Sequence, residues 1–298
     1  MSQILITGGA GFIGAKITSA FYKLGHKITI IDNTTDKNRI EEMRPFATIR
    51  DLDIADHTAV KKVFDENEFN YVVHLAAKHY IPYCESHPIP TWATNVVGTY
   101  NVLSCMPPTA SLFFSSTAAV YAPSSNPQKE TDVLGPIDIY GWSKLTDEQM
   151  ILTLAPKLRI RYTIARFFNV YGKGDTNQHL IPEIISQSKV SSTIHLGNLS
   201  SVRDYVHVDD VARAIVELTT TKPLLNDIVN VGSGYGYSGK DIFDAINKEC
   251  AQKLTLKIAN NRIRKIDKPY LVADNSKMIS ILGWRPMPFK ETTSLLEN

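Results

Sequence analysis

Short apolar runs alternate with amphipathic helical patterns through the first half of the chain. We expect strands at residues 4–7, 27–32, 47–52, 71–75, 111–115 and 161–167, and helices at residues 12–24, 58–66, 92–105 and 140–154. Strands that alternate with helices in this way are typical of repeated βαβ units, which build a parallel sheet with helices on both faces. The pattern therefore predicts an α/β protein with a Rossmann-type, doubly wound parallel sheet.

After about residue 169 this regular alternation ends. Glycine, asparagine, serine and proline become frequent and the elements become shorter, which predicts a smaller C-terminal α/β lobe at residues 169–298 beside a cofactor domain at residues 1–168. Residues 206–218 are an exception, because they read as a strand that runs into a helix. Asp209 and Asp210 are expected to cap that helix. We expect the stretch at about residues 203–220 to pack back on the first domain.

The composition narrows the class of protein. The chain has 298 residues, of which 43% are hydrophobic and 21% are charged, as in ordinary globular proteins. Its formal net charge of +2 gives no indication of a nucleic-acid partner, and no apolar run is long enough to span a membrane. Cys84, Cys105 and Cys250 are scattered and odd in number, which favours neither a disulfide framework nor a metal site. We expect a cytoplasmic protein without a metal ion.

Three glycines follow the first expected strand and open the first expected helix. They are Gly8, Gly11 and Gly14, spaced as Gly-x-x-Gly-x-x-Gly. Glycine lets the backbone turn tightly and approach a pyrophosphate, and a helix N-terminus offers amide groups and a favourable dipole. The segment predicts a dinucleotide site, although a glycine-rich turn without a ligand is the alternative.

An acidic residue ends the second expected strand. Asp32 lies where a carboxylate meets the adenosine ribose in dinucleotide-binding folds. Such a carboxylate accepts hydrogen bonds from the ribose hydroxyls and repels a 2′-phosphate, which favours NAD over NADP. Lys37 and Arg39 follow soon after and weaken that preference. Alternatively, Asp32 is a turn residue before Asn33.

A tyrosine and a lysine lie one helical turn apart at Tyr140 and Lys144. A lysine ammonium close to a phenol favours the phenolate, so we expect Lys144 to lower the pKa of Tyr140. A phenolate beside a nicotinamide takes a proton from an alcohol while the ring takes the hydride. Without the glycine loop, two surface neighbours on a helix would be the simpler interpretation.

Other polar residues are weaker candidates. Ser115, Ser116 and Thr117 end a strand, and any of the three hydroxyls could hold the reacting oxygen or cap the strand end. Arg203 and Arg264 could meet an anionic substrate, although a solvated surface charge is the simpler interpretation for each.

Together these residues resemble the extended short-chain dehydrogenase/reductase family, and within it the NAD-dependent nucleotide-sugar epimerases of the UDP-glucose 4-epimerase type. The resemblance covers nearly the whole chain. Its motifs are residues 7–14, 53–56, 74–77, 95–99, 115–117, 140–144, 166–172, 203–210, 230–234 and 282–284.

The resemblance implies a role for individual residues. For NAD, it implies pyrophosphate contacts from Gly8, Gly11, Phe12 and Ile13, adenosine-ribose contacts from Asp32 and Asn33, adenine contacts from Asp53 and Ile54, and contacts near the middle of the cofactor from Ala76, Ala77, Asn95 and Ser115. It makes Thr117, Tyr140 and Lys144 the catalytic residues, with Tyr140 and Lys144 also touching the cofactor. For the substrate, it implies contacts from Thr117, Asn169, His179, Arg203, Arg264 and Asp267.

One departure from the family pattern bears on the reaction. Dehydratases of the family carry Asp-Glu directly after the catalytic threonine, whereas this chain has Ala118 and Ala119. The resemblance therefore implies an isomerase that inverts carbon 4 of a nucleotide-diphosphate sugar, with a UDP-sugar favoured, through a 4-keto intermediate. The alternatives are an NAD(P)H-dependent reductase of a 4-keto nucleotide sugar and a non-catalytic NAD-binding regulator. The family resemblance also implies a homodimer.

Overall fold

The computed structural model describes residues 1–34, 36–175, 177–220, 226–263 and 267–289, and these residues form two compact units. Unit 1 consists of Met1–Val120, Leu134–Arg166 and Val211–Val229, and unit 2 consists of Tyr121–Val133, Phe167–Asp210 and Asn230–Asn298. The chain therefore passes between the units several times. The sequence pattern suggested a division after residue 168, with about residues 203–220 packed back on the first domain, and Val211–Val229 belongs to unit 1.

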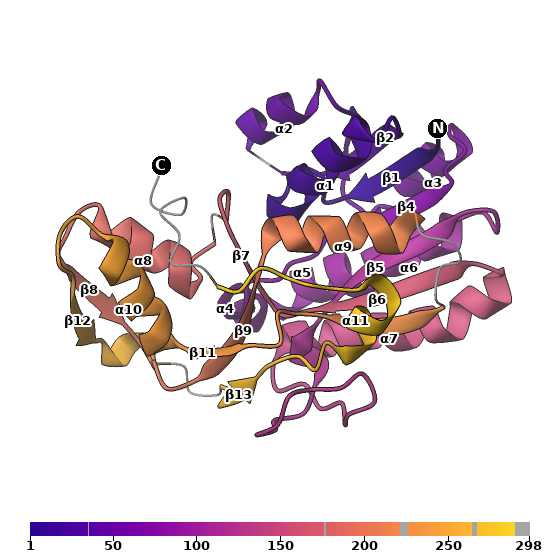
Figure 1. The fold of residues 1–298 in the computed structure, drawn as a ribbon. Helices are drawn as coiled ribbons and strands as arrows, with labels where there is room; N and C mark the ends of the chain where they lie inside the picture. The colour runs from indigo at the N-terminus through magenta and orange to yellow at the C-terminus, as the bar shows by residue number, and fades with distance from the viewer. Residues whose placement is uncertain (35, 176, 221–225, 264–266, 290–298) are drawn as a thin grey trace. The chain divides into compact units, whose positions relative to one another are not determined.

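Unit 1 is built around a sheet flanked by helices (Figure 1). Its strands are β1 (Gln3–Thr7), β2 (Lys27–Asp32), β3 (Thr48–Asp51), β4 (Tyr71–His74), β5 (Ser111–Thr117), β6 (Arg161–Phe167) and β10 (Asp227–Val231). Its helices are α1 (Phe12–Lys23), α2 (Lys37–Met43), α3 (His57–Asp65), α4 (Ile81–Ser86), α5 (Pro88–Trp92), η1 (Ala93–Val97), α6 (Gly98–Cys105), η2 (Ala118–Val120), α7 (Ile139–Leu158) and most of α9 (Val208–Thr220).

The strand order confirms the Rossmann-type fold. The seven-stranded sheet has the order β10-β6-β5-β4-β1-β2-β3, and the pairs from β3 to β5 are parallel. The chain moves outward from β1 in one direction and then crosses back to β4 on its other side. Ligands of such sheets bind beyond the carboxyl ends of the strands at this reversal. The sheet order therefore places the dinucleotide site between the ends of β1 and β4.

A continuous hydrophobic core holds the sheet of unit 1 to helices α3, α6 and α7. Leu5, Val72 and Phe114 from neighbouring strands are fully buried in it, and Val60 of α3 and Ile151 of α7 close it from the helical side. Removing apolar surface from water contributes roughly 25 cal/mol per Å². This core keeps α7, which carries the tyrosine and lysine motif, against the sheet.

The helix expected at residues 92–105 is interrupted. The structure has α5 up to Trp92, a π-helical turn at Ala93–Val97, and α6 from Gly98. Hydrophobic spacing reports the buried face of a helix and not the hydrogen-bond partners inside it, so the pattern did not predict the wider turn. Such π turns are frequent at functional sites, and this one carries Asn95.

Unit 2 contains two small sheets and their helices (Figure 1). Its elements are β7 (Asn169–Tyr171), α8 (Leu180–Ser188), β8 (Thr193–Leu196), β9 (Val202–His207), β11 (Gly236–Ser238), α10 (Gly239–Glu249), β12 (Thr255–Ile258), η3 (Asn260–Arg262), β13 (Tyr270–Leu271) and α11 (Ser276–Leu282). Strand β9 pairs with β11, β13 and β7, and β8 pairs with β12. A second core, which includes Ile184, Ile194 and Phe243, packs α8 and α10 against β8.

The expectation that Asp209 and Asp210 cap α9 is wrong. Helix α9 begins at Val208, so Asp209 and Asp210 lie in its first turn and not at the cap position. The ring nitrogen Nδ1 of His207 accepts the amide hydrogen of Asp209 at 3.3 Å, and the carboxylate of Asp210 accepts the amide hydrogen of Met287 at 2.8 Å. Acidic residues in a first turn still stabilise the helix through its dipole.

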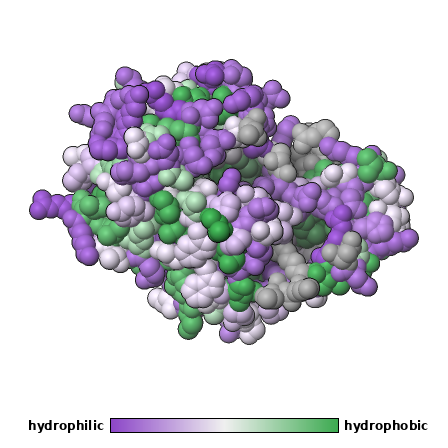
Figure 2. All heavy atoms as spheres, turned by 180° about the vertical axis from the view of Figure 1, so that it is seen from behind, coloured by the Kyte–Doolittle hydropathy of each residue, from purple (hydrophilic) through white to green (hydrophobic). Residues whose placement is uncertain are grey.

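The surface is mixed in character. Figure 2 shows hydrophobic residues spread among hydrophilic ones over one face of the molecule, with hydrophilic residues predominating at its upper end. Within the part of the chain that the structure describes, no helix combines the length and hydrophobicity needed to cross a bilayer.

Candidate active site

The glycine loop forms a close-packed turn with an open side. Gly8 has a φ of +73°, and a Cβ atom there would lie 2.8 Å from the backbone nitrogen of Ala76. A Cβ atom on Gly14 would lie 2.1 Å from the carbonyl oxygen of Gly8, so neither position accepts a side chain. At Gly11 the added atom would meet only the Gly8 oxygen, at 3.2 Å.

This arrangement leaves room in front of α1. Gly11 is the N-cap of this helix, and no side chain caps its first turn, which holds Phe12 and Ile13. The N-terminus of a helix attracts anions through its amide groups and its dipole. The loop therefore fits the pyrophosphate of a dinucleotide, with Gly11 as the point of closest approach.

The ends of β2 and β3 meet beside this loop. The Asp32 carboxylate accepts the amide hydrogens of Ala10 and Thr34, each at 2.9 Å, and so ties β2 to the glycine loop. Burial raises the pKa of Asp32, although these hydrogen bonds oppose the shift. The side-chain amide of Asn33 donates to Asp53 at 3.1 Å. Three residues predicted at the adenosine end of the cofactor are thus brought together.

The nearby cations are engaged with acids. Lys37 lies 3.4 Å from Asp51 and Arg39 lies 3.5 Å from Asp36, measured between charged nitrogen and carboxylate oxygen. Both pairs leave these side chains less available for a 2′-phosphate, although exposed pairs are weak. The arrangement fits NAD better than NADP.

Asn95 organises the loop that follows β4. Its side-chain oxygen accepts the amide hydrogen of Lys78 at 2.7 Å, while its amide nitrogen donates to the Lys78 carbonyl at 3.0 Å and to the Ser143 hydroxyl at 2.8 Å. Asn95 is fully buried, so its contacts hold the segment containing Ala76 and Ala77 against α7. We therefore interpret Asn95, which was predicted to lie near the cofactor, as a residue that supports this loop.

The three hydroxyls at the end of β5 have different partners. Ser115 donates to the carbonyl of His74 at 3.0 Å, and Ser116 donates to the buried Glu148 carboxylate at 2.5 Å. The side chain of Thr117 lies near that of Tyr140 and lowers its pKa. Both serine hydroxyls are thus bonded to other groups of the protein, whereas the Thr117 hydroxyl lies near Tyr140. The family resemblance implied that Thr117 is the catalytic hydroxyl.

The expected effect of Lys144 on Tyr140 is wrong for this structure. Burial raises the pKa of Tyr140, and although the nearby Thr117 side chain opposes the shift, the carboxylates of Asp138 and Asp147 add to it. Lys144 does not offset these effects, because its ammonium lies 3.9 Å from the ring centroid of Phe114 and 3.7 Å from a carboxylate oxygen of Asp147. The amphipathic pattern predicted the shared helix face but not these competing partners.

Two further buried groups beside the site were missed by the sequence analysis. The carboxylate of Glu148 accepts two hydrogen bonds from Arg166, at 2.9 and 2.7 Å, in addition to the one from Ser116. Arg166 and Glu148 have side chains that are 1% and 0% exposed. The available signal was a pair of adjacent acids, Asp147 and Glu148, on the same helix as Tyr140 and Lys144.

Of the predicted substrate residues that the structure describes, Thr117 lies in unit 1, and Asn169, His179, Arg203 and Asp267 lie in unit 2. Arg203 pairs with Asp267 at 2.5 Å and donates to the Val202 carbonyl, and both side chains are largely buried. His179 is the N-cap of α8 and bonds to Asp175 at 3.0 Å, which outweighs burial and lowers the pKa of that carboxyl. Asn169 begins β7 and is exposed. Arg264 lies outside the described residues.

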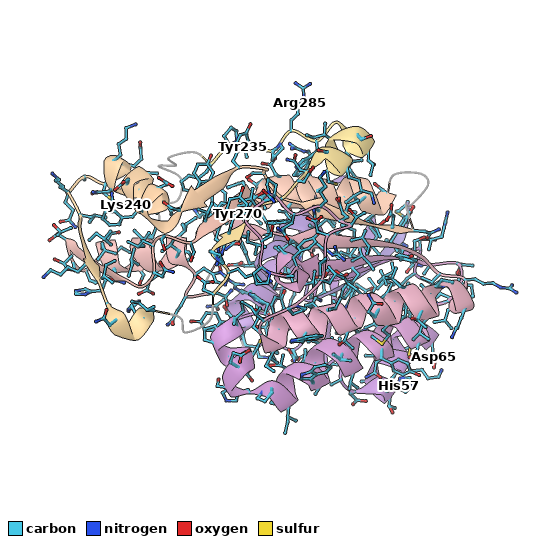
Figure 3. The ribbon with its side chains drawn as sticks, turned by 90° about the horizontal axis from the view of Figure 1, so that it is seen from below. His57, Asp65, Tyr235, Lys240, Tyr270 and Arg285 are labelled. Carbon is cyan, nitrogen blue, oxygen red and sulfur yellow. The ribbon has the colours of Figure 1, made fainter. Side chains whose placement is uncertain are left out.

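A separate surface pocket lies between α3 and α6 of unit 1. It has a volume of about 450 Å³ and is lined by His57, Lys61 and Asp65 of α3 and by Tyr100 and Cys105, among others, of α6. Figure 3 shows His57 and Asp65 near one another, at the two ends of α3. Across the described part of the chain, no group of three or more histidine, cysteine or acidic side chains is arranged to hold a metal ion.

Comparison with known proteins identifies the family of this chain. The model of the NAD dependent epimerase/dehydratase family matches residues 4–232. The chain belongs to this family. A UDP-glucose 4-epimerase of Corynebacterium glutamicum is 32% identical over 303 residues, which cover 95% of this chain and 91% of that protein.

Solved structures in the family share the fold over almost the full length. The UDP-glucose 4-epimerase of Thermotoga maritima, with UDP-glucose, is 28% identical with a TM-score of 0.89, covering 99% of this chain and 96% of that chain. The UDP-glucose 4-epimerase of Thermus thermophilus, in complex with NAD, is 26% identical with a TM-score of 0.87, covering 99% and 97%.

Proposed function

We propose that this chain is an NAD-dependent epimerase that inverts carbon 4 of a nucleotide-diphosphate sugar, with a UDP-sugar as the favoured substrate. The observation that carries the proposal is the placement of Thr117 near Tyr140 at the carboxyl end of β5, where open α/β sheets place their chemistry. The named relatives, which are UDP-glucose 4-epimerases over nearly the whole chain, support the reaction and the nucleotide.

The chain's own residues perform the proton chemistry. Tyr140 takes the proton from the 4-hydroxyl and later returns one to the 4-keto oxygen, while Thr117 orients that oxygen by hydrogen bonding. Bound NAD supplies the group that accepts a hydride and gives it back. The family resemblance implies that Arg203 binds the diphosphate through its guanidinium, as arginine does in many phosphate sites. The diphosphate stays bound while the sugar turns over between the two transfers.

The residues after Thr117 favour epimerisation over loss of water. Elimination from the sugar needs an acid near the leaving hydroxyl, and the family resemblance places such acids at residues 118 and 119. Ala118 and Ala119 are buried apolar side chains in the 3-10 turn η2, 2% and 9% exposed. Neither side chain donates a proton, so a 4-keto intermediate has no route to dehydration at this position.

The proposal predicts turnover without added coenzyme. Purified protein incubated with a panel of UDP-, dTDP-, GDP- and CDP-sugars should convert one of them to its 4-epimer, observed by NMR at the sugar ring protons. Because the hydride returns, NAD should stay bound and its amount should not change. Stoichiometric consumption of NADH or NADPH would indicate the keto-sugar reductase instead, and no turnover with any sugar would favour the regulator.

We also propose a homodimer joined through α5, η1, α6 and α7. These elements pack against one another and carry exposed hydrophobic side chains: Ile89, Trp92, Val97, Tyr100 and Trp142 are 37% to 81% exposed. Val97→Glu should convert the dimer to a monomer in sedimentation velocity, because it places a charge in an apolar contact. Val190→Glu, the same change at an exposed valine of unit 2, should leave a dimer. If neither the wild-type protein nor Val190→Glu is a dimer, the proposal is wrong.

The cytoplasmic location stays a prediction.

A further inference from the structure

Three polar side chains follow one face of helix α7. Tyr140, Lys144 and Asp147 are spaced at i, i+4 and i+7, which places them in a row along the helix. The Lys144 and Asp147 side chains are only 2% and 0% exposed, and the lysine nitrogen lies 3.7 Å from a carboxylate oxygen. The row therefore continues past the tyrosine and lysine motif into a buried ion pair.

Asp147 differs from its neighbour Glu148 in how its charge is compensated. Glu148 has three hydrogen bonds, from Ser116 and Arg166. Neither buried oxygen of Asp147 has a hydrogen-bond partner among the described residues. Burial raises the pKa of Asp147 to about 8, and Lys144 and Thr99 oppose that shift. A buried carboxylate without hydrogen bonds is costly, so its stability as an anion depends on the lysine charge.

The other groups around Lys144 do not supply a counter-charge. Phe114 of β5 offers a ring face, and the Thr99 hydroxyl of α6 is bonded to Nε2 of His74 at 2.9 Å. Burial, and then the charge of Lys144, lower the pKa of His74 on β4 to about 3, so this ring is neutral. Glu148 is already paired with Arg166 of β6. Two described acids act on Lys144, and of these Glu148 is paired with Arg166 whereas Asp147 is paired with Lys144 itself.

Lys144 needs such a partner to stay charged. Burial lowers the pKa of Lys144 to about 8, and the charges of Asp147 and Glu148 oppose that shift. An ammonium that loses its proton near neutral pH no longer acts as a charged hydrogen-bond donor to a ribose hydroxyl. The state of Lys144 at working pH thus depends on the carboxylate one turn along the helix.

We propose that Asp147 is a positioning residue of the epimerase, whose carboxylate holds Lys144 in its charged form and sets the pH above which the lysine loses that charge. The inference rests on the proposed function for the role of Tyr140, whereas the coupling of Asp147 to Lys144 holds for any reaction at this site. The direct effect of Asp147 on Tyr140 has the opposite direction, because its negative charge raises the tyrosine pKa.

These two effects separate on a pH profile of kcat. Loss of the Lys144 proton lowers the rate as pH rises, whereas ionisation of Tyr140 raises the rate. Removing the Asp147 charge lowers the lysine pKa, so the fall at high pH should move to lower pH in Asp147→Asn. A charge at this distance shifts a pKa by about 1 to 3 units, which is the expected displacement. Asp147→Glu, which keeps the charge, should restore most of the wild-type profile.

Asp138→Asn is the matched control. Asp138 caps α7 by accepting the amide hydrogen of Gly141 at 2.7 Å, and asparagine caps helices equally well. Its charge also raises the pKa of Tyr140 but is absent from the groups that act on Lys144. This variant should therefore leave the fall at high pH unchanged. An equal displacement in both variants would show a general charge effect and overturn the inference.

A direct titration of Lys144 tests whether Asp147 controls its protonation, independently of activity. The full-length protein is labelled with ¹³Cε-lysine, the Lys144 signal is identified by its loss in Lys144→Arg, and its chemical shift is followed with pH by NMR. We expect a pKa below that of ordinary lysine in the wild type, and a further decrease of about 1 to 3 units in Asp147→Asn. An unchanged Lys144 pKa in that variant would overturn the inference.

The same titration covers two remaining outcomes. If Asp147→Asn does not fold, Asp147→Glu and the wild type still decide, because an ordinary lysine pKa in both would contradict a buried, charge-dependent pair. If no nucleotide sugar is turned over, the proposed function fails, while the NMR titration still reports on the pair of Lys144 and Asp147. The two proposals therefore fail separately.

Discussion

Replacement of Tyr140 by phenylalanine is expected to lower the rate of epimerisation by about 10²- to 10⁴-fold, the usual contribution of a positioned acid or base. Phenylalanine keeps the aromatic ring but has no hydroxyl proton to exchange with the 4-hydroxyl. The Thr117 side chain also loses its neighbouring hydroxyl. The measurement is kcat with the sugar identified by the NMR panel, together with the amount of bound NAD.

The control for this variant is the same substitution at an exposed position. Tyr22 lies on α1 with 48% of its surface exposed, and Tyr22→Phe should retain the wild-type kcat. Bound NAD should remain in both variants, because the glycine loop and Asp32 are unchanged. A fully active Tyr140→Phe enzyme would exclude the proposed proton transfer, even if the protein still epimerises a nucleotide sugar.

Replacement of Arg166 by methionine is expected to destabilise the protein by about 3 to 5 kcal/mol, the usual result of removing one partner of a buried ion pair. The change leaves Glu148 fully buried with Ser116 as its remaining hydrogen-bond partner from this cluster. The expected loss is large because a carboxylate in an apolar core has no access to water. The free energy of unfolding, measured by urea denaturation followed by circular dichroism, tests this prediction.

A double variant separates the buried charge from the lost packing. Arg166→Met combined with Glu148→Leu removes both charges, so it should be more stable than Arg166→Met alone despite having two substitutions. Removing one partner of an exposed pair, as in Lys61→Met beside Asp65, should have a much smaller effect. If Arg166→Met is no less stable than Lys61→Met, the buried pair does not stabilise unit 1.

Local sequence patterns were sufficient for the Rossmann-type fold and for the dinucleotide site. Gly8, Gly11 and Gly14 follow β1 directly, and Asp32 ends β2, so these residues are set by short-range geometry. The alternation of strands and helices then determines a parallel sheet, and its carboxyl edge is where the candidate residues gather. The expected strands and most of the expected helices of the first 168 residues are confirmed for this reason.

Residue spacing could not choose among the hydroxyls at the end of β5. The choice depends on which partners the folded chain brings to each hydroxyl: Glu148, on a helix 32 residues away, engages Ser116, and the His74 carbonyl on the next strand engages Ser115. The family resemblance points to Thr117, and its catalytic role stays a prediction. The interruption of the helix at Asn95 likewise follows from contacts with Lys78 and Ser143.

What the sequence determined by itself is the row of Tyr140 and Lys144 on one helix face, because helical periodicity is a local property. The electrostatic state of that row was decided only by the tertiary structure. Packing of α7 on the sheet removes water from both side chains and sets Lys144 between Phe114 and Asp147. Burial acts on a pKa through neighbours that are distant in sequence, so the direction of the Tyr140 shift could not be read from the motif.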